Sequence, residues 1–474
     1  MENLYLLLPV LLPAVTGLVL LLARPRKSDT PAFLAAVLTA VLAAFGGNRI
    51  LKLPFTEGVS CLLAPDGLSL FFLLLIACAF ACALLYAREY LAGDERRPLF
   101  YGFALLTLGS MMGLSMAGNM VTFYMFYEMM SLFSFPLVLY NGGEKPRRAA
   151  LFYLGFSVFG ACLALMGLLL GGETTLKAFS EPVAAQPLTP MLVTAFFLMA
   201  LGFSCKAGMM PLANWLPIAH PEAPAPASAL LSGIITKAGI LGMIRTAFCL
   251  FGSANLAGTW AQKVLLILSV VTIFTGSMLA YKEKLLKKRL AYSSVSQLSY
   301  VIFGLMLMSR AGLEGALLQV LFHACAKVGL FLCAGAFIHH AGAHYVQQLR
   351  GMGRKMPVVM ACFTCFSLSL VGIPPFGGFI SKWQLASAAL AQGSVTAQVG
   401  VVILMVSALL TAGYLLDIVS AAYFPGEDFG PVKKKDAGFA MVLPLCLLAA
   451  AAALLGLVPE SVLSFFHSAA AGFF

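Results

Sequence analysis

Ionisable side chains inside long apolar segments are the residues of this 474-residue chain most able to do chemistry. A charge at the centre of a bilayer costs about 2.5–3.5 kcal/mol, so such residues need a partner, water or a function. One Lys–Glu pair could serve helix packing alone, but four lysines exceed what one central glutamate can neutralise. The set therefore predicts a path for protons or cations. Its members are Glu128, Lys206, Lys237, His323, Lys327 and Lys382.

Lysine suits a proton relay because its hold on a proton depends on its surroundings. Burial favours the neutral amine, whereas a nearby carboxylate favours the ammonium. Arginine stays charged and cannot release its proton in this way. His323 and Lys327 are four residues apart in QVLFHACAKVGLFL, so they share one helix face. A histidine alone there would be interpreted as a packing residue, but beside Lys327 a relay is the better interpretation.

Two of these lysines lie next to predicted helix breaks. The segment GMMPLANWLP interrupts one apolar run soon after Lys206, and VGIPPFGGFISKW interrupts another just before Lys382. Proline removes a backbone donor and glycine permits conformations that other residues avoid. Interrupted helices at corresponding places in two halves of a chain mark the ion sites of inverted-repeat transporters. The two breaks therefore support an ion path independently of the charges.

Three further charged or polar residues have open interpretations. His220, in WLPIAHPEAPAPASALL, is either a surface residue or a gate on the inner side of the path. Asp417 either pairs with a loop lysine or acts as a gate. Arg245 lies near the outer end of its helix, where its charge is expected to snorkel to the membrane surface.

The composition places these residues in a membrane protein. Hydrophobic residues make up 61% of the chain and charged residues 10%, against about 25% charged residues in soluble domains. This excludes an ordinary soluble protein and predicts an all-α polytopic membrane protein. The first apolar run lacks a basic leader and another run follows it, so we expect a membrane span rather than a cleaved signal peptide. The net charge of +11 is expected to set topology, not to bind nucleic acid.

The eleven cysteines predict no metal centre. All lie inside apolar runs or just beside one, and the pair Cys362–Cys365 has no second pair and no nearby ligating histidine. Small buried hydrophobes are the expected role. The sequence also has no iron–sulfur cysteine set, dinucleotide fingerprint or quinone-binding constellation, so no cofactor is expected in this chain.

About fourteen apolar runs are long enough to be spans. They cover 3–23, 32–47, 67–87, 99–117, 119–140, 149–171, 190–210, 226–251, 260–281, 290–309, 313–340, 357–391, 398–423 and 438–458. One set of alternate loops holds 20 Lys and Arg, among them Lys145, Arg147, Arg148, Lys287 and Arg289, and the other set holds five. The positive-inside rule then places both termini outside, in what we expect to be a prokaryotic inner membrane.

Three segments carry a resemblance to a known family: KAGMMPLANWLPIAHPEAPAPASALLSGIITKAGILGMIRT, LKKRLAYSSVSQLSY and HACAKVGLFLCAG. They resemble the antiporter-like subunits shared by respiratory complex I, energy-converting membrane-bound hydrogenases (formate hydrogenlyase included) and Mrp-type multisubunit Na⁺/H⁺ antiporters. The likeness extends from Asp66, in PDGLSLFF, to the thirteenth predicted helix. AHPEAPAPASALLSG and GGFISKWQL look closer to the hydrogenase and Mrp D-type branches.

The resemblance implies fourteen core helices with two inverted five-helix repeats, in which helices 7 and 12 are broken. On this chain that gives helices 1–3 in residues 1–98, the first repeat (helices 4–8) in 99–251, the second (helices 9–13) in 260–423, and helix 14 with a tail in 438–474. It also implies a proton relay made of a fifth-helix glutamate paired with a seventh-helix lysine, an eighth-helix bridging lysine, polar eleventh-helix positions and a twelfth-helix exit residue. The residues that match, in that order, are Glu128, Lys206, Lys237, His323 with Lys327, and Lys382.

Two residues depart from the family pattern. Lysine stands at position 382 where one complex I subunit has glutamate, and AGYLLDIVSAAYF has no arginine near Asp417. The leading hypothesis is a proton-translocating subunit, with possible Na⁺/H⁺ exchange, of a multisubunit redox-driven or Mrp-type complex. Its partners would be other membrane subunits, which would hold any redox chemistry.

Two competing hypotheses remain open at this stage. A self-contained secondary transporter for an organic solute would work alone and would have a substrate-sized cavity at the midplane. A structural scaffold would tolerate Met or Leu at Lys206 and Lys382 without loss of function. Stable co-purification with other membrane subunits favours the leading hypothesis over the self-contained transporter.

Overall fold

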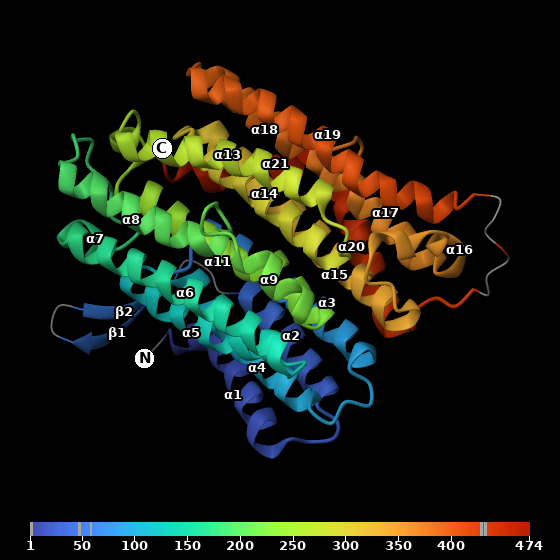
Figure 1. Ribbon diagram of the computed structural model, residues 1–474. Coiled ribbons are helices and arrows are strands. Elements are labelled where there is room, and N and C mark those ends of the chain that lie inside the picture. The colour runs from blue at the N-terminus through green and yellow to red at the C-terminus, as the bar shows by residue number, and fades with distance from the viewer. Residues whose placement is uncertain (1–2, 46–48, 57–58, 427–429, 431–433) are drawn as a thin grey trace.

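The computed structural model describes residues 3–45, 49–56, 59–426, 430 and 434–474. Long helices lie side by side and make up most of the molecule (Figure 1). Apolar runs form helices in a membrane because a helix satisfies its own backbone hydrogen bonds where water is absent. The predicted polytopic helical fold is confirmed.

The N-terminal part holds the helices α1 to α3 and one antiparallel hairpin. Its elements are η1 (Leu4–Leu7), α1 (Leu8–Ala23), α2 (Asp29–Ala44), β1 (Leu51–Thr56), β2 (Val59–Leu63) and α3 (Gly67–Tyr90). Leu51 pairs with Leu63 in the hairpin, which extends from one end of the bundle (Figure 1). An all-helical prediction missed this hairpin because its strands are short and lie between spans.

The next part contains the first interrupted helix. Its elements are α4 (Arg97–Met116), α5 (Met120–Leu139), α6 (Glu144–Gly171), α7 (Glu173–Leu176), α8 (Pro190–Ala207), α9 (Trp215–Glu222), α10 (Ala225–Leu230), the π-helical η2 (Leu231–Ile235), α11 (Thr236–Ile244), the π-helical η3 (Arg245–Leu250) and α12 (Ser253–Leu256). Gly208 ends α8 with φ +81°, a conformation that disfavours a side chain. The predicted break after Lys206 is confirmed.

The last part contains the second interrupted helix. Its elements are α13 (Trp260–Lys282), α14 (Leu286–Met306), α15 (Arg310–Ala341), η4 (Val346–Leu349), α16 (Met352–Lys355), α17 (Pro357–Val371), α18 (Gly377–Gln392), α19 (Val395–Tyr423), α20 (Phe439–Leu457) and α21 (Pro459–Ala471). Gly372, with φ +89°, ends α17 before Lys382 on α18. The second predicted break is also confirmed.

Within the described residues, 11 helices are long and apolar enough to cross a membrane. The remaining predicted spans fall on α2, on α14 and on the pair α17–α18. The helices α2 and α17 are short, and α14 carries Lys287, Lys288 and Arg289 with a serine-rich middle. The count of fourteen and the division into inverted repeats therefore remain predictions.

Burial separates central helices from peripheral ones. The apolar window of the segment 225–250 is wholly buried and that of α15 is 89% buried, whereas only 33% of the window in α19 is buried. Helices α17 and α18 pack against α15, and α8 packs against α6 and α11. Each broken helix, with its lysine, therefore packs against a central core that contains α10–α11, α14 and α15.

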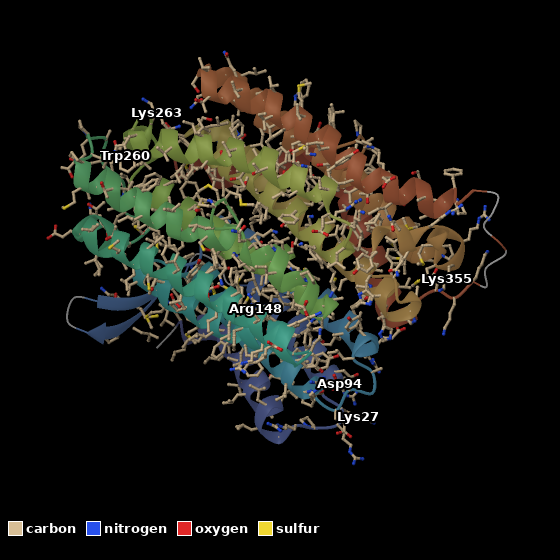
Figure 2. All side chains as sticks on the ribbon, viewed as in Figure 1. Lys27, Asp94, Arg148, Trp260, Lys263 and Lys355 are labelled. Atoms are coloured by element: carbon tan, nitrogen blue, oxygen red, sulfur yellow. The ribbon has the colours of Figure 1, made fainter. Side chains whose placement is uncertain are left out.

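Two of the basic residues counted for one side of the membrane lie at the end of the bundle opposite the termini. Figure 1 places both termini at one end, and Figure 2 shows Lys27 and Lys355 at the opposite end. Lys433, another of the basic residues counted for the same side, lies outside the described residues. Which end faces the cytoplasm remains a prediction of the positive-inside rule.

Several residues assigned to loops belong to helices instead. Helix α6 begins at Glu144, so Arg147 and Arg148 lie in its first turns. Lys287 and Arg289 lie in the first turn of α14 and are each only 6% exposed. The loop assignment was wrong here because charged residues are favourable on the first turns of a membrane helix when they reach water or protein acceptors.

Candidate functional site

Lys206 lies near the end of α8 and is 1% exposed. Its ammonium donates to the hydroxyl oxygen of Tyr153 at 3.0 Å and to Oγ of Ser157 at 2.8 Å. These two acceptors are one helical turn apart on α6, so they present adjacent oxygens to one amine. The Tyr153 ring also lies 4.5 Å from the ammonium, a cation–π distance. Lys206 is held in this structure by neutral groups.

Glu128 lies on α5 and is half-buried. The hydroxyl of Tyr124 hydrogen-bonds to it, and Lys206 interacts with it electrostatically. No ion pair within 4.0 Å joins Glu128 to Lys206 among the described side chains. The direct pair implied by the family resemblance is therefore not formed here, because the lysine reaches the α6 hydroxyls instead.

The helices of Lys206 and Lys237 are in direct contact. A side chain at Gly239 on α11 would place its Cβ 2.4 Å from the carbonyl oxygen of Phe203 and 3.2 Å from Cβ of Lys206. Glycine permits this approach, and a methyl group would push α11 away from α8. The close packing places the first lysine beside the central helix that carries the second.

Lys237 and His323 form the centre of the site. Lys237 Nζ lies 2.8 Å from Nδ1 of His323 and donates to the carbonyl of Ser232 at 2.7 Å. Neither side chain is more than 1% exposed. Ser232 lies in the π-helical turn η2, a distortion that is frequent at functional sites. A buried amine and a buried imidazole in direct contact can exchange a proton.

Lys327 follows His323 by one turn on α15, as the sequence predicts, and is fully buried. Its ammonium donates to the carbonyl of Leu290 on α14 at 2.9 Å. Its charge, when the amine is protonated, acts on both Lys237 and His323. The two predicted polar positions of α15 therefore lie together in the core.

His220 is not a surface residue. It is fully buried on α9, and its ring lies 4.7 Å from that of Phe331, with interplanar angle 26°. Neither ring nitrogen has a hydrogen-bond partner among the described residues. The charges of Lys237, Lys327 and Lys287 all act on it. The surface interpretation is wrong, and the gate interpretation remains a prediction.

Lys382 hydrogen-bonds to the backbone at the helix break between α17 and α18. Its ammonium donates to the carbonyls of Leu370 and Val371 at 2.7 and 2.6 Å. These carbonyls belong to the end of α17, where the helix break leaves them without an amide partner. The side chain of Lys382 therefore caps the two free carbonyl groups that the break leaves at the end of α17.

A polar void joins the centre to Lys382. His323, Gln297, Gln319, Ser369 and Lys382 contribute to its lining, and it is too narrow to hold a water molecule in this conformation. Nε2 of His323, Nε2 of Gln297 and Oγ of Ser369 are buried without a hydrogen-bond partner in the described part of the chain. Buried polar atoms without partners are costly, and here three of them surround one void.

Two glutamines in this lining were not singled out by sequence reasoning. Gln319 donates to Oε1 of Gln297 at 2.8 Å and accepts from Ser381 at 2.7 Å. Sequence reasoning also missed Lys287, which is buried and donates to the carbonyl of Ala223 at 2.6 Å. The only signal for Gln297 and Lys287 was the polar character of LKKRLAYSSVSQLSY, which crosses the start of the predicted span 290–309, and Lys287 itself was assigned to the preceding loop.

Arg245 does not snorkel. It is 2% exposed and forms a two-pronged ion pair with Asp66, with N–O distances of 2.6 and 2.8 Å. Burial alone would raise the pKa of Asp66, but the Arg245 charge and hydrogen bonds, with those of Ser69, lower it from 3.8 to about 2. Snorkelling was a wrong prediction because a carboxylate before α3 meets the arginine inside the protein.

Asp417 is exposed on α19 and lies outside this central cluster. Arg289 of α14 donates to the carbonyl of Tyr414 on α19 at 2.8 Å, and no ion pair between Arg289 and Asp417 is present among the described residues. The predicted alternatives for Asp417, a partner for a loop lysine and a gate, are not supported by any hydrogen bond of its side chain in the described residues.

Among the described residues there is no group of three or more His, Cys, Asp or Glu that could hold a metal ion.

Comparison with known proteins places this arrangement in a family. Residues 117–411, more than half of the chain, match the model of the NADH:quinone oxidoreductase/Mrp antiporter transmembrane family. The chain belongs to this family. The matched region of this antiporter-family chain contains every one of the six relay candidates, from Glu128 to Lys382.

Relatives of the antiporter-family chain belong to more than one kind of membrane complex. It is 32% identical to NADH-quinone oxidoreductase subunit N of Desulforudis audaxviator, over 94% of this chain and 93% of that protein. It is 33% identical to hydrogenase-4 component B of Escherichia coli, over 70% of this chain and 51% of that protein. A chain of respiratory complex I from Thermus thermophilus with bound NADH superposes with a TM-score of 0.86, at 26% identity, over 99% of this chain and 98% of that one. The chain is thus an antiporter-like integral membrane subunit.

Proposed function

We propose that this chain translocates protons, and exchanges Na⁺ if its complex does, as one membrane subunit of a complex I-like, hydrogenase-type or Mrp-type assembly. The path runs from Glu128 and Lys206 through Lys237 and His323, beside Lys327, to Lys382. The observation that carries the proposal is the 2.8 Å contact between Lys237 Nζ and His323 Nδ1, deep in the core and beside a polar void that reaches Lys382.

The first step concerns Lys206. In this conformation its ammonium is held by two neutral hydroxyls and not by Glu128. Moving the ammonium toward Glu128 would strengthen its hold on a proton, and moving it back toward the hydroxyls would weaken that hold. A shift of charge in a neighbouring subunit could drive this exchange because Glu128 is only half-buried.

The central step is a transfer from Lys237 to His323. When the ammonium donates to Nδ1, the neutral imidazole carries its own proton on Nε2. Accepting the lysine proton at Nδ1 and releasing the other proton from Nε2 moves one charge across the ring. Nε2 has no hydrogen-bond partner among the residues that the structure describes, and the ring lines the void that leads to Lys382.

The last step needs a small widening of the void. His323 Nε2, Gln297 Nε2 and Ser369 Oγ are unpartnered polar atoms that would stabilise a water molecule there. Such a water would connect the imidazole to Lys382. The ammonium of Lys382 then releases its proton at the broken helix, which we assign to the outer side with both termini.

The test is proton and Na⁺ flux in inverted membrane vesicles that contain the whole complex. We expect Lys206→Ala to abolish coupled flux while subunit composition stays unchanged. Lys145→Ala, an exposed lysine on the basic side of the membrane, is the matched control. Wild-type flux in Lys206→Ala would overturn the proposal and favour a scaffold or a silent copy.

A further inference from the structure

A groove on the exposed face of α6 lies apart from the proposed proton path. It has a volume of about 810 Å³, within the range of ligand pockets. Its mouth is lined by Glu144, Arg147 and Arg148 and its length by apolar side chains, among them Phe152 and Phe156. One acid and two arginines leave the mouth with a net positive charge.

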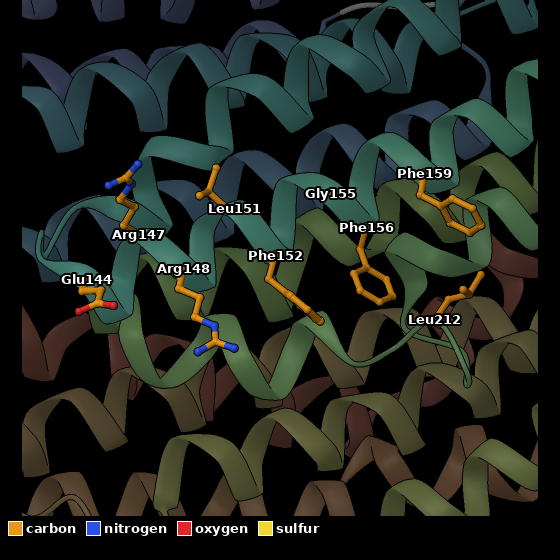
Figure 3. A pocket seen from close by; sticks show the side chains of 9 residues that line it. All are labelled: Glu144, Arg147, Arg148, Leu151, Phe152, Gly155, Phe156, Phe159 and Leu212. Atoms are coloured by element: carbon orange, nitrogen blue, oxygen red, sulfur yellow. The ribbon is translucent and has the colours of Figure 1, made fainter.

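The groove follows one face of the helix. Arg148, Phe152, Phe156 and Phe159 recur at spacings of four, four and three residues, which places them on one helical stripe. Figure 3 shows Arg148, Phe152 and Phe156 projecting from α6 toward the segment that carries Leu212. Phe152 is 38% exposed and Phe159 is 51% exposed, so the stripe is open to an occupant.

The length of the stripe matches one leaflet of a bilayer. From Arg148 to Phe159 the helix rises about 16 Å at 1.5 Å per residue. Half of the hydrocarbon core is about 15 Å thick. The charged mouth therefore lies where lipid headgroups begin, and the aromatic end lies near the midplane.

We infer that this groove binds an anionic phospholipid, with its phosphate at Arg147 and Arg148 and one acyl chain along Phe152 and Phe156. The planar guanidinium of arginine can donate two hydrogen bonds to the oxygens of one phosphate group. Basic residues at a membrane surface also attract anionic lipids. The mouth lies at the end of α6 that carries the basic loop, which the positive-inside rule assigns to the cytoplasmic leaflet. This inference does not depend on the proposed transport function.

The bound lipid would pack against the wall of the Lys206 site. Tyr153 and Ser157, which hold Lys206, lie on the buried face of the same stretch of α6. The thiol of Cys205 donates to the carbonyl of Phe156 at 3.1 Å and to that of Leu212 at 3.8 Å, so two groove residues contact the neighbour of Lys206. An acyl chain in the groove would cover this junction from the lipid side.

The test uses the full chain in detergent, with dioleoyl phosphatidylglycerol or dioleoyl phosphatidylcholine added, and native mass spectrometry to count retained lipids. We expect phosphatidylglycerol to bind with about fivefold higher affinity than phosphatidylcholine. Arg148→Gln should lower its affinity about fivefold, whereas Lys145→Gln, an exposed neighbour that does not line the groove, should not. Equal retention of the two lipids, or equal effects of the two substitutions, would overturn the inference.

A second substitution tests the acyl-chain site without changing charge. A Cβ at Gly155, which lines the groove, would meet no atom within 4 Å. Gly155→Leu should therefore fill the groove without disturbing the protein, and remove the tightly held phosphatidylglycerol. Val158→Leu, at a residue of α6 that is 43% exposed and outside the groove lining, is the control. Retention that survives Gly155→Leu would show that the lipid lies elsewhere and contradict the inference.

Discussion

Replacing Lys382 by methionine separates a working relay from a scaffold. Methionine is close to lysine in length and flexibility but has no donor and no titratable proton. The ammonium it removes donates to the carbonyls of Leu370 and Val371, at the end of α17. The substitution therefore removes a backbone cap and a relay group together, and two measurements distinguish these roles.

The stability change follows from the two carbonyls. A buried polar group left without a partner costs about 1–3 kcal/mol, so two cost about 2–6 kcal/mol. Removing the ammonium also removes the cost of keeping that charge away from water, which offsets part of the loss. We expect a net decrease of about 2 kcal/mol in the free energy of unfolding, less than typical total stabilities. The variant should therefore fold and assemble.

Transport should respond more strongly than stability. We expect no coupled proton flux from Lys382→Met in inverted vesicles that contain the whole complex, together with a small decrease in the thermal unfolding midpoint. Lys145→Met, an exposed lysine, should change neither quantity. Wild-type flux with unchanged or raised stability is the result a scaffold predicts, and it would refute the relay reasoning.

Two other substitutions test contacts that hold the site together. A Cβ at Gly378 would lie 1.8 Å from the carbonyl oxygen of Ser369, so Gly378→Ala should displace α18, lower the thermal unfolding midpoint and reduce proton flux. Gly155→Ala, where a Cβ would meet no atom, should change neither quantity, and equal midpoints for these two variants would contradict the close contact. Folding lowers the pKa of Asp66 from 3.8 to about 2. The ion pair with Arg245 therefore stabilises the folded protein above about pH 4, and this stabilisation is lost as the pH falls through about 2. The stability difference between wild type and Asp66→Asn should thus be constant from about pH 8 to about pH 5 and narrow below about pH 4; a difference that vanishes between pH 8 and 5 would count against the pair.

Local signals in the sequence were enough to predict most of the long helices and both breaks, but not short helices such as α9 and α21. Apolar runs specify spans because a helix is the available way to satisfy backbone groups in lipid. Glycine and proline act on their own neighbourhood, so the ends of α8 at Gly208 and α17 at Gly372 could be predicted beside Lys206 and Lys382. The spacing of His323 and Lys327 also required only helical geometry.

Contacts between distant segments could not be predicted in the same way. Arg245 meets Asp66 from 179 positions away, and Lys206 meets hydroxyls on α6 instead of Glu128. Whether a charged residue snorkels, pairs or binds a carbonyl depends on which helix is its neighbour, and no local pattern contains that information. The burial of His220 was missed for the same reason.

The most direct test of the account is proton flux in His323→Gln. Glutamine retains an oxygen that can accept the hydrogen bond from Lys237, so the contact at 2.8 Å and the surrounding packing can persist. It cannot take up one proton and release another as imidazole does. The account predicts an assembled complex whose coupled proton flux falls by about a hundredfold or more, in the range that general acid–base groups contribute. An assembled complex with wild-type flux would contradict a proton path through His323.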